Sequence, residues 1–339
     1  MKSAVFYGKH DLRVEELPKP VISDDQVLIR VKACGVCGTD VHIYEGDKGA
    51  AACTPPTILG HEFSGVVEEI GNKVIGVKVG DRVSVDPNQT CSQCYYCKNG
   101  LAHYCQNMIG YGTTANGAFA EYCAVNFQQV YLLGDNTTFE QGAMGEPVAC
   151  CLHGIDMCEI TPGSVVAVIG GGMIGLIMLQ LARLSGAHQT ILLEPVAAKR
   201  AMGVKLGADL VIDPLTEDVH EILKTNGIHR INTVIECAGL PATIKTAIDI
   251  AGNKSVVMMF GLTKPDEEVN IKPFQIFQKE ITLKASFINP YTHQRALDLI
   301  NSGRIDVSSM VYSVSPLYDL ESVLSNPEWR AKGKYIIRV

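Results

Sequence analysis

Four cysteines lie close together in a polar segment of the chain. They follow the spacing Cys91-x2-Cys94-x2-Cys97-x7-Cys105. Four thiolates so close in sequence suit a closed tetrahedral zinc site that contributes to folding. The residues between them are mostly polar or turn-forming, and thiols without a metal in so exposed a loop would oxidise. The spacing therefore predicts a structural zinc ion bound by all four cysteines.

Three short motifs elsewhere could supply ligands for a second metal ion. They are Cys37-Gly38-Thr39-Asp40, Gly60-His61-Glu62 and Glu146-Pro147. Thiolate, imidazole and carboxylate are the usual donors of catalytic zinc. Each motif also has an ordinary interpretation, as a free cysteine, a capped histidine or a solvated acid. Sequence spacing alone does not bring the three together, so at this point the second site is a hypothesis.

A glycine-rich turn indicates a dinucleotide site. Gly170, Gly172 and Gly175 follow an apolar run, and Met173 and Ile174 open a helical pattern. Glycines let the backbone approach a pyrophosphate, which the free N–H groups of the helix N-terminus then bind. We therefore expect these five residues to contact a nicotinamide dinucleotide.

The choice between NAD and NADP depends on the end of the next predicted strand. Glu194 stands there, where an acid binds the ribose hydroxyls and repels a 2′-phosphate. Lys199 is a further candidate cofactor contact one turn later, and with Arg200 it leaves NADP as an alternative. The sequence thus favours NAD.

The second half of the chain alternates apolar runs with helical patterns, which is typical of a parallel sheet covered on both faces. The predicted strands are 165–169, 190–194, 210–212, 232–236, 255–260 and 281–286. The predicted helices are 173–185, 197–206, 217–224, 241–250 and, near the C-terminus, 293–302. Six such strands make a doubly wound dinucleotide-binding fold. The first part of the chain instead shows short strands, including 26–34, 63–70 and 118–125, and a last strand is expected at 335–339.

Composition limits the kinds of partner. The chain has 339 residues, 19% of them charged, and a formal net charge of −7. A chain of this length is expected to form two domains, and its acidity argues against a nucleic-acid partner. We find no stretch long enough to span a membrane and no signal peptide. Twelve cysteines without an export signal indicate a reducing compartment, so we expect a cytoplasmic protein.

The motifs together resemble the zinc-containing branch of the medium-chain dehydrogenase/reductase family. The resemblance is carried by residues 34–40, 60–67 and 80–83 and by the four-cysteine spacing. It implies an α/β protein with a GroES-like β domain over 1–150, completed by 289–339. A six-stranded Rossmann domain over 151–288 would bind NAD. The implied activity is oxidation of an alcohol at a catalytic zinc, so the protein should hold two zinc ions, one structural and one catalytic.

The resemblance also implies a role for each residue of the dispersed motifs. Cys37, His61 and Glu62 match the ligands of the catalytic zinc. Thr39 and His42 match the hydroxyl and imidazole that relay the substrate proton to solvent.

Two acids complete the implied site. Asp40 matches the carboxylate that orients the ligating histidine. Glu146 matches an acid that either ligates zinc or bonds its water. One thiolate and one carboxylate already neutralise Zn²⁺, and a permanent further carboxylate would oppose ionisation of the alcohol. We therefore expect Glu146 to act on the zinc-bound water or to exchange as a ligand, with Cys150 as an alternative ligand.

Three functions compete at this stage. Glu146-Pro147 and His153 are similar to polyol (sorbitol) dehydrogenases, although the arginine expected after residues 281–286 is absent, which argues against sorbitol itself. Residues 37–44 are equally similar to L-threonine 3-dehydrogenases, which the family pattern pairs with aspartate at position 146. The third candidate is a zinc- and NAD-binding regulatory protein without turnover. We expect a dehydrogenase of polyols or sugar derivatives that forms a homodimer or homotetramer. Residues 256–260 are a candidate apolar contact surface, with burial in the core as the alternative.

Overall fold

The protein is described here by a computed structural model that covers residues 1–47, 52–330 and 332–339. The chain divides into two compact units, Met1–Ala149 with Asn289–Val339, and Cys150–Ile288. The division expected from the sequence differs from this one by a single residue. Within the described part of the chain, no helix has the length and apolar character needed to cross a membrane.

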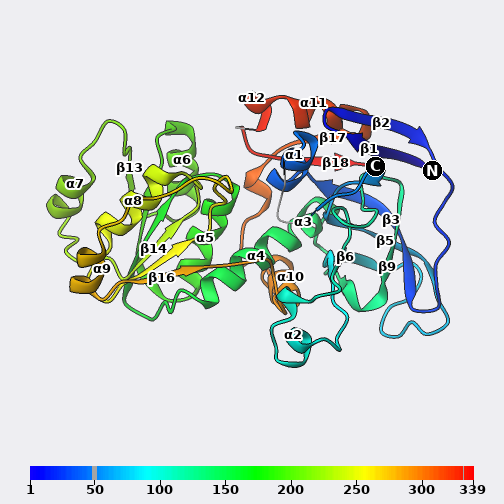
Figure 1. Cartoon of the computed structure of the whole chain (residues 1–339), viewed down its shortest axis with the longest axis horizontal. Coiled ribbons are helices and arrows are strands. Elements are labelled where there is room, and N and C mark those ends of the chain that lie inside the picture. Colours follow the sequence, from blue (N-terminus) through cyan, green and yellow to red (C-terminus); the bar gives the residue numbers. More distant parts are fainter. Residues whose placement is uncertain (48–51, 331) are drawn as a thin grey trace. The chain divides into compact units, whose positions relative to one another are not determined.

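The second unit is built on a six-stranded parallel sheet (Figure 1). The strand order is β13-β12-β11-β14-β15-β16, which confirms the predicted doubly wound sheet. The strands are β11 (Ser164–Ile169), β12 (Ala187–Leu193), β13 (Leu210–Ile212), β14 (Thr233–Glu236), β15 (Val256–Met259) and β16 (Thr282–Ala285).

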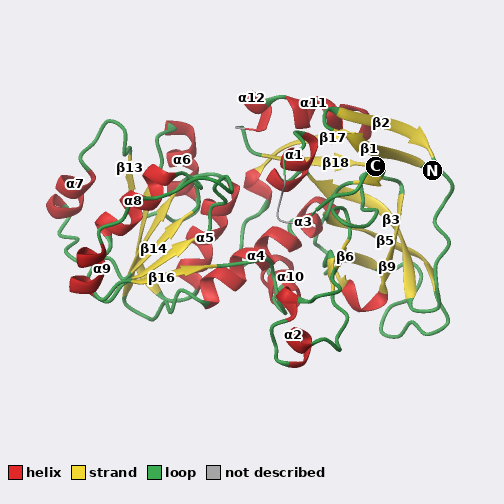
Figure 2. Ribbon diagram, in the orientation of Figure 1, coloured by secondary structure: helices red, strands yellow, loops and turns green. Residues whose placement is uncertain are grey.

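Helices cover both faces of this sheet (Figure 2). They are α5 (Met173–Leu184), α6 (Ala197–Lys205), α7 (Val219–Thr225), α8 (Pro241–Ile250) and α9 (Pro273–Lys279). On one face, Val168 meets α5 at Gly175 and Leu192 meets α6 at Gly203. On the other face, alternate residues such as Ala167 pack in one buried cluster with residues of α7 and α8. Burial of both faces explains why these strands are continuous apolar runs.

One expectation for this unit was wrong, and one of its helices had not been predicted. The run at 256–260 is not a contact surface, because β15 is an interior strand and Val256, Val257 and Met258 are buried in the sheet. Helix α9 was not predicted. Its Phe274 and Phe277 are largely exposed, so the segment lacks the buried apolar face that marks a helix in the sequence.

The first unit consists of antiparallel sheets closed by two C-terminal strands. Its main sheet has the order β10-β6-β5-β3-β18-β17, with β9 also paired to β3, and smaller sheets have the orders β2-β1-β4 and β7-β8. The strands are β1 (Lys2–Gly8), β2 (Asp11–Glu16), β3 (Gln26–Gly35), β4 (Thr57–Ile58), β5 (Glu62–Ile70), β6 (Arg82–Val85), β7 (Asn88–Gln89), β8 (Ile109–Gly110), β9 (Tyr122–Asn126), β10 (Val130–Leu132), β17 (Val311–Pro316) and β18 (Lys334–Arg338). The α-helices that begin in this unit are α1 (Gly38–Tyr44), α2 (Tyr95–Lys98), α3 (Phe139–Ala143), α4 (Gly145–Asp156), α10 (His293–Asn301), α11 (Leu320–Ser325) and α12 (Pro327–Arg330).

The strand predicted at 118–125 begins only at Tyr122. Residues before it are bonded to several partners in turn, because Phe119 accepts from the Ala4 N–H and Glu121 donates to the Lys2 carbonyl. They are paired, but they form no single ladder. The structure also contains β17, which the sequence did not predict, parallel to the predicted last strand.

Candidate active site

The four predicted structural cysteines converge in a lobe of the first unit. The sulfur atoms of Cys91, Cys94, Cys97 and Cys105 all lie within 4.8 Å of one another. The short helix α2 carries Cys97, and Cys94 stands immediately before that helix. Four cysteine sulfurs this close together fit a closed four-thiolate zinc site of the structural kind.

Backbone N–H groups in this lobe favour the thiolate forms of Cys91 and Cys94, whereas burial raises the pKa of Cys97 to about 11. Bonds from the N–H groups of Gln93 and Cys94 lower the pKa of Cys91 to about 6. Bonds from Cys97 and Gln106 lower the pKa of Cys94 as well. Zinc binds the thiolate and not the thiol, so these donors favour metal binding by Cys91 and Cys94.

Strand register assembles the second cluster from distant parts of the sequence. Strand β3 ends at Gly35, two residues before Cys37, and β5 begins with Glu62 directly opposite Gly35. Gly60 has φ +93, and a side chain there would collide with Cys34 and Phe119. Its left-handed backbone turns the chain into β5, which places His61 and Glu62 beside the end of β3.

Three candidate donors meet at this end of the sheet. One ligand atom each of Cys37, His61 and Glu62 lies within 4.8 Å of the other two. His61 and Glu62 are buried, and Cys37 is half-buried. A half-buried thiolate with a buried imidazole and carboxylate at this separation fits a zinc ion that keeps a position open for another ligand.

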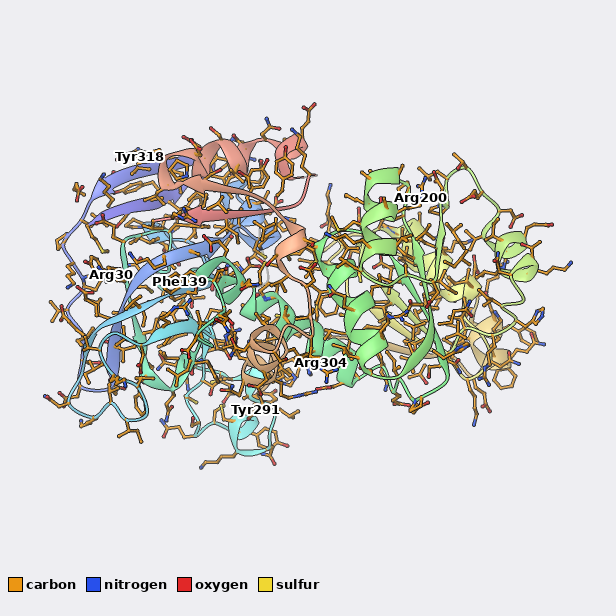
Figure 3. The ribbon with its side chains drawn as sticks, turned by 180° about the vertical axis from the view of Figure 1, so that it is seen from behind. Arg30, Phe139, Arg200, Tyr291, Arg304 and Tyr318 are labelled. Carbon is orange, nitrogen blue, oxygen red and sulfur yellow. The ribbon has the colours of Figure 1, made fainter. Side chains whose placement is uncertain are left out.

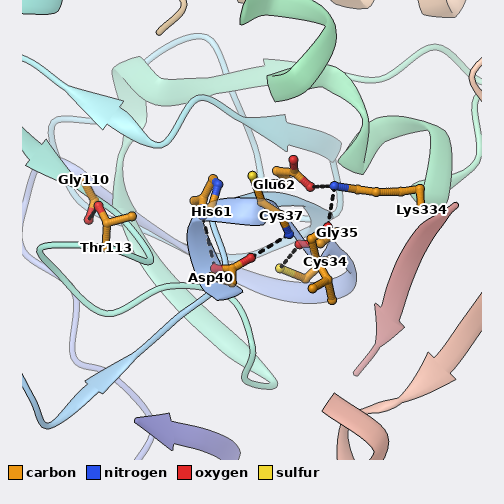
Figure 4. A network of polar contacts seen from close by, with 10 residues as sticks. Cys34, Gly35, Cys37, Asp40, His61, Glu62, Gly110, Thr113 and Lys334 are labelled. Atoms are coloured by element: carbon orange, nitrogen blue, oxygen red, sulfur yellow. Dashed lines mark hydrogen bonds and ion pairs between the residues drawn. The ribbon is translucent and has the colours of Figure 1, made fainter. Parts of the chain in front are cut away.

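Asp40 makes two contacts within this cluster (Figure 4). Its Oδ2 accepts the backbone N–H of Cys37 at 2.8 Å, which fixes the start of α1. Its Oδ1 lies 3.4 Å from Nδ1 of His61, so Nε2 is the ring nitrogen left for a metal. Burial lowers the pKa of His61, but the Asp40 and Cys37 anions more than reverse this and raise it well above its usual range.

The structure adds one residue that sequence reasoning missed. Lys334, at the start of β18, forms an ion pair with Oε2 of Glu62, and both side chains are buried. Burial lowers the pKa of Lys334, but attraction to Glu62 and Cys37 outweighs it and raises the pKa. The only signal in the sequence was a lysine at the edge of a short apolar run, and nothing in that run identified its partner.

Lys334 changes the charge count made from the sequence, but not its conclusion. That count omitted both Lys334 and Asp40, whose formal charges are opposite. With Zn²⁺ and Lys334 on one side, and Cys37, Glu62 and Asp40 on the other, three positive charges balance three negative ones. A further permanent carboxylate would still make the site anionic.

The candidate relay residues lie on helix α1. Thr39 and His42 are three positions apart, so they share one side of the helix, and both are half-buried. Nδ1 of His42 lies 3.7 Å from Oδ2 of the exposed Asp47. His42 thus reaches solvent while Thr39 stands two residues from Cys37.

Glu146 and Cys150 are not part of the three-donor cluster. Glu146 is buried in the first turn of α4, and Cys150 is half-buried one turn later. The 4.8 Å grouping contains neither of them.

The structure explains two of the predicted glycines of the turn in the second unit, Gly170 and Gly175, by backbone geometry. Gly170 has φ +100, and a Cβ on Gly175 would collide with the Gly170 carbonyl. At Gly172, the residue that precedes α5, an added Cβ would meet no atom of the described residues within 4 Å. No described neighbour explains that glycine, whereas a pyrophosphate at the N-terminus of α5 would. Met173 and Ile174 form the first turn of this helix.

The carboxylate of Glu194 is fixed against the same turn. Its Oε2 accepts the N–H of Gly171 at 2.6 Å, and its Oε1 accepts the N–H of Val196 at 2.8 Å. Arg200, which is labelled in Figure 3, donates to the carbonyl of Glu194 and pairs with Asp213 at 3.1 Å. Lys199 lies one residue earlier on α6.

Comparison with known proteins identifies the family. Residues 23–135 match the alcohol dehydrogenase GroES-like domain, and residues 173–302 match the zinc-binding dehydrogenase domain. The chain is 34% identical to D-arabinitol dehydrogenase 1 of Uromyces fabae, over 95% of this chain and 93% of that one. It is 37% identical to L-threonine 3-dehydrogenase of Caldanaerobacter subterraneus, over 85% and 81%.

A solved structure is similar over the whole length. A putative zinc-binding dehydrogenase from Sinorhizobium meliloti, bound to NADP, superposes with a TM-score of 0.96 at 37% identity. It covers 100% of this chain and 99% of that one. The chain belongs to the zinc-containing medium-chain dehydrogenase/reductase family, and it is a zinc-dependent oxidoreductase.

Proposed function

We propose that this enzyme oxidises a secondary alcohol of a polyol or sugar derivative and transfers the hydride to NAD. The observation that carries the proposal is the buried cluster in which Cys37, His61 and Glu62 bring one donor atom each within 4.8 Å of the others. In this assignment these three residues hold a catalytic zinc, and the four-cysteine lobe holds a structural one. When bound, zinc polarises an alcohol oxygen and the nicotinamide accepts hydride.

The chain's own residues supply proton transfer. Thr39 takes the proton of the substrate hydroxyl, and His42, on the same side of α1, passes it to solvent. Asp40 keeps Nδ1 of His61 protonated, so that Nε2 is available as a ligand. Glu146 would hydrogen-bond water at a zinc ion held by Cys37, His61 and Glu62.

NAD is the proposed cofactor. Glu194 brings a negative charge to the end of β12, where NADP would place its 2′-phosphate. Arg200 cannot compensate freely, because its guanidinium is already bound to Asp213 and to backbone carbonyls. The similar Sinorhizobium meliloti protein was solved with NADP, which makes NADP the alternative cofactor.

Polyols are favoured over threonine by the acid at position 146. The resemblance to threonine dehydrogenases implies aspartate there, and this chain has glutamate. Similarity to an arabinitol dehydrogenase supports the polyol assignment. Similarity to a threonine dehydrogenase makes amino-acid alcohol oxidation the second candidate.

A substrate panel tests the proposal. Zinc-loaded protein is mixed with NAD and with polyols, sugar acids or L-threonine, and NADH absorbance is followed. We expect the highest kcat/KM with a polyol or sugar derivative. A preference for L-threonine would support the second candidate. Absence of turnover in zinc-replete protein with every compound would support the regulatory function instead.

Two carboxylate variants test the ligand assignment. Glu146→Gln should keep the catalytic zinc while turnover falls about 10–100-fold, as is usual for groups beyond the metal ligands. Glu62→Gln should lose that zinc under the same dialysis, because it removes a charged ligand. The reverse pattern of zinc content would make Glu146 the ligand and contradict the assignment of Glu62.

We further propose a cytoplasmic homo-oligomer, either a dimer or a tetramer. Strand β16 forms one edge of the parallel sheet, and β15 is its partner there among the described strands, so a second copy could pair with it. None of the twelve cysteines forms a disulfide among the described residues, which suits a reducing compartment. A monomeric mass at micromolar concentration would contradict the assembly.

A further inference from the structure

The buried ammonium of Lys334 faces the candidate catalytic cluster from a third strand. Strand β18 pairs with β3 on the side opposite β5, with Ile336 opposite Gly35. Lys334 lies two residues before Ile336, so it reaches across the end of β3 toward Glu62. Only 4% of the residue is exposed, which is rare for a lysine unless its charge is paired.

Lys334 binds only one of the two carboxylate oxygens of Glu62. Its Nζ binds Oε2 of Glu62 and also donates to the carbonyl of Val36 at 2.8 Å (Figure 4). Oε1 of Glu62 is buried and has no hydrogen-bond partner among the described residues. A buried carboxylate oxygen without a partner is costly, unless a cation or another donor binds it.

The backbone leaves room for this pair. A Cβ on Gly35 would collide with Oε2 of Glu62 and lie 2.8 Å from Cε of Lys334. The pair therefore depends on a glycine at the end of β3. Three adjacent strands together fix both charges in one orientation.

We propose that Lys334 is a positioning residue of the catalytic metal centre. By holding Oε2, it presents Oε1 alone to the metal, so that Glu62 binds through one oxygen and can be released during turnover. If Glu62 left the metal, its negative charge would stay paired with Lys334 and would not be buried without a partner. This inference rests on the proposed assignment of Cys37, His61 and Glu62 as zinc ligands.

The sign of one measurement separates this role from simple structural support. Lys334→Met removes the charge and keeps a long apolar side chain. Zinc then no longer competes with an ammonium for Glu62, so the catalytic site should bind zinc at least about tenfold more tightly, or about 1.4 kcal/mol. A lysine that only supports the fold predicts unchanged or weaker zinc binding.

Zinc affinity is measured on the full chain by competition with a chelator. A Cys37→Ser variant, which lacks the catalytic site, identifies the zinc that belongs to the four-cysteine lobe. Lys332→Met is the matched control, since Lys332 is an exposed lysine on the same segment. Visible absorption of the Co²⁺-substituted protein provides a second readout, because it changes with coordination number. We expect Lys334→Met, but not Lys332→Met, to shift the spectrum toward higher coordination.

Loss of folding is controlled by a second substitution. If Lys334→Met alone is unstable, the double variant Glu62→Gln/Lys334→Met removes both buried charges and should recover stability. Failure of that recovery would contradict the pairing. If Lys334→Met left both the zinc affinity and the Co²⁺ spectrum unchanged, the inference about Lys334 would be overturned and the proposed function would stand. If the wild type bound no zinc outside the four-cysteine lobe, the proposed function itself would be overturned.

Discussion

Replacing Asp40 with asparagine should weaken the catalytic zinc while leaving the fold intact. The Asn carbonyl can still accept the Cys37 N–H, which Asp40 now accepts at 2.8 Å. The amide NH₂ must then face Nδ1 of His61, which lies 3.4 Å from Oδ1 in the native protein. Nδ1 becomes an acceptor, the ring proton moves to Nε2, and Nε2 cannot ligate a metal while it carries that proton.

The expected magnitude follows from this geometry. Loss of a carboxylate that orients a ligating histidine costs about 10–100-fold in metal affinity, or about 1.4–2.7 kcal/mol. Asp40→Ala also removes the carboxylate that accepts the Cys37 N–H at the start of α1, and loss of a hydrogen bond to a charged group costs about 1.5–3 kcal/mol of unfolding free energy. Asparagine should therefore affect zinc alone, and alanine should affect both zinc and stability.

The assay measures zinc retained after dialysis against a chelator, together with chemical unfolding. Asp47→Asn is the matched control, because Asp47 also faces an imidazole, that of His42 at 3.7 Å, but is exposed. It should keep wild-type zinc content. If Asp40→Asn retained zinc like the wild type, and Asp40→Ala lost only stability, Asp40 would be a helix cap and the tautomer argument would be refuted.

Three further predictions concern other parts of the molecule. Cys94→Ser should lose the structural zinc and have a lower melting temperature, with NAD affinity unchanged. The control Cys53→Ser should keep both zinc ions, because Cys53 belongs neither to the four-cysteine cluster nor to the Cys37, His61 and Glu62 cluster. The specificity constants of the wild type should favour NAD over NADP. Glu194→Gln should reduce that preference at least about tenfold, because it removes the charge beside Gly171. A wild-type preference for NADP would contradict the assignment. Burial raises the pKa of Asp86 from 3.8 to about 6, so its contribution to stability is complete below pH 3.8 and is lost as pH rises through 6. Asp86→Asn should accordingly stabilise the protein by up to about 3 kcal/mol at pH 8 and by little at pH 4, and equal effects at both pH values would refute this.

Local patterns predicted the parts of the site that are local in sequence. The four-cysteine lobe lies within one short loop, and the glycine turn lies between one strand and one helix. The strands of the second unit were predictable because both sheet faces are buried, which makes each strand a continuous apolar run. In these cases the residues that interact are also neighbours in the chain.

The Glu62–Lys334 pair could not be predicted in this way, because 272 residues separate the partners. They meet only through the register of β5 and β18 on either side of β3, and register across a long separation leaves no periodic signal. The same limit applies to residues 256–260. An apolar run is consistent with a buried strand or with an exposed contact surface, and only the sheet order decides between them.

The most direct test of the assigned catalytic centre is a zinc anomalous-scattering map of the zinc-loaded crystal. We expect two peaks in each chain. One should lie among the four cysteine sulfurs, and the other about 2.0–2.3 Å from Sγ of Cys37, Nε2 of His61 and one oxygen of Glu62, with the second Glu62 oxygen on Lys334. A single peak at the four cysteines would contradict the catalytic site. A second peak ligated by Glu146, with Glu62 bound only to Lys334, would contradict the ligand set.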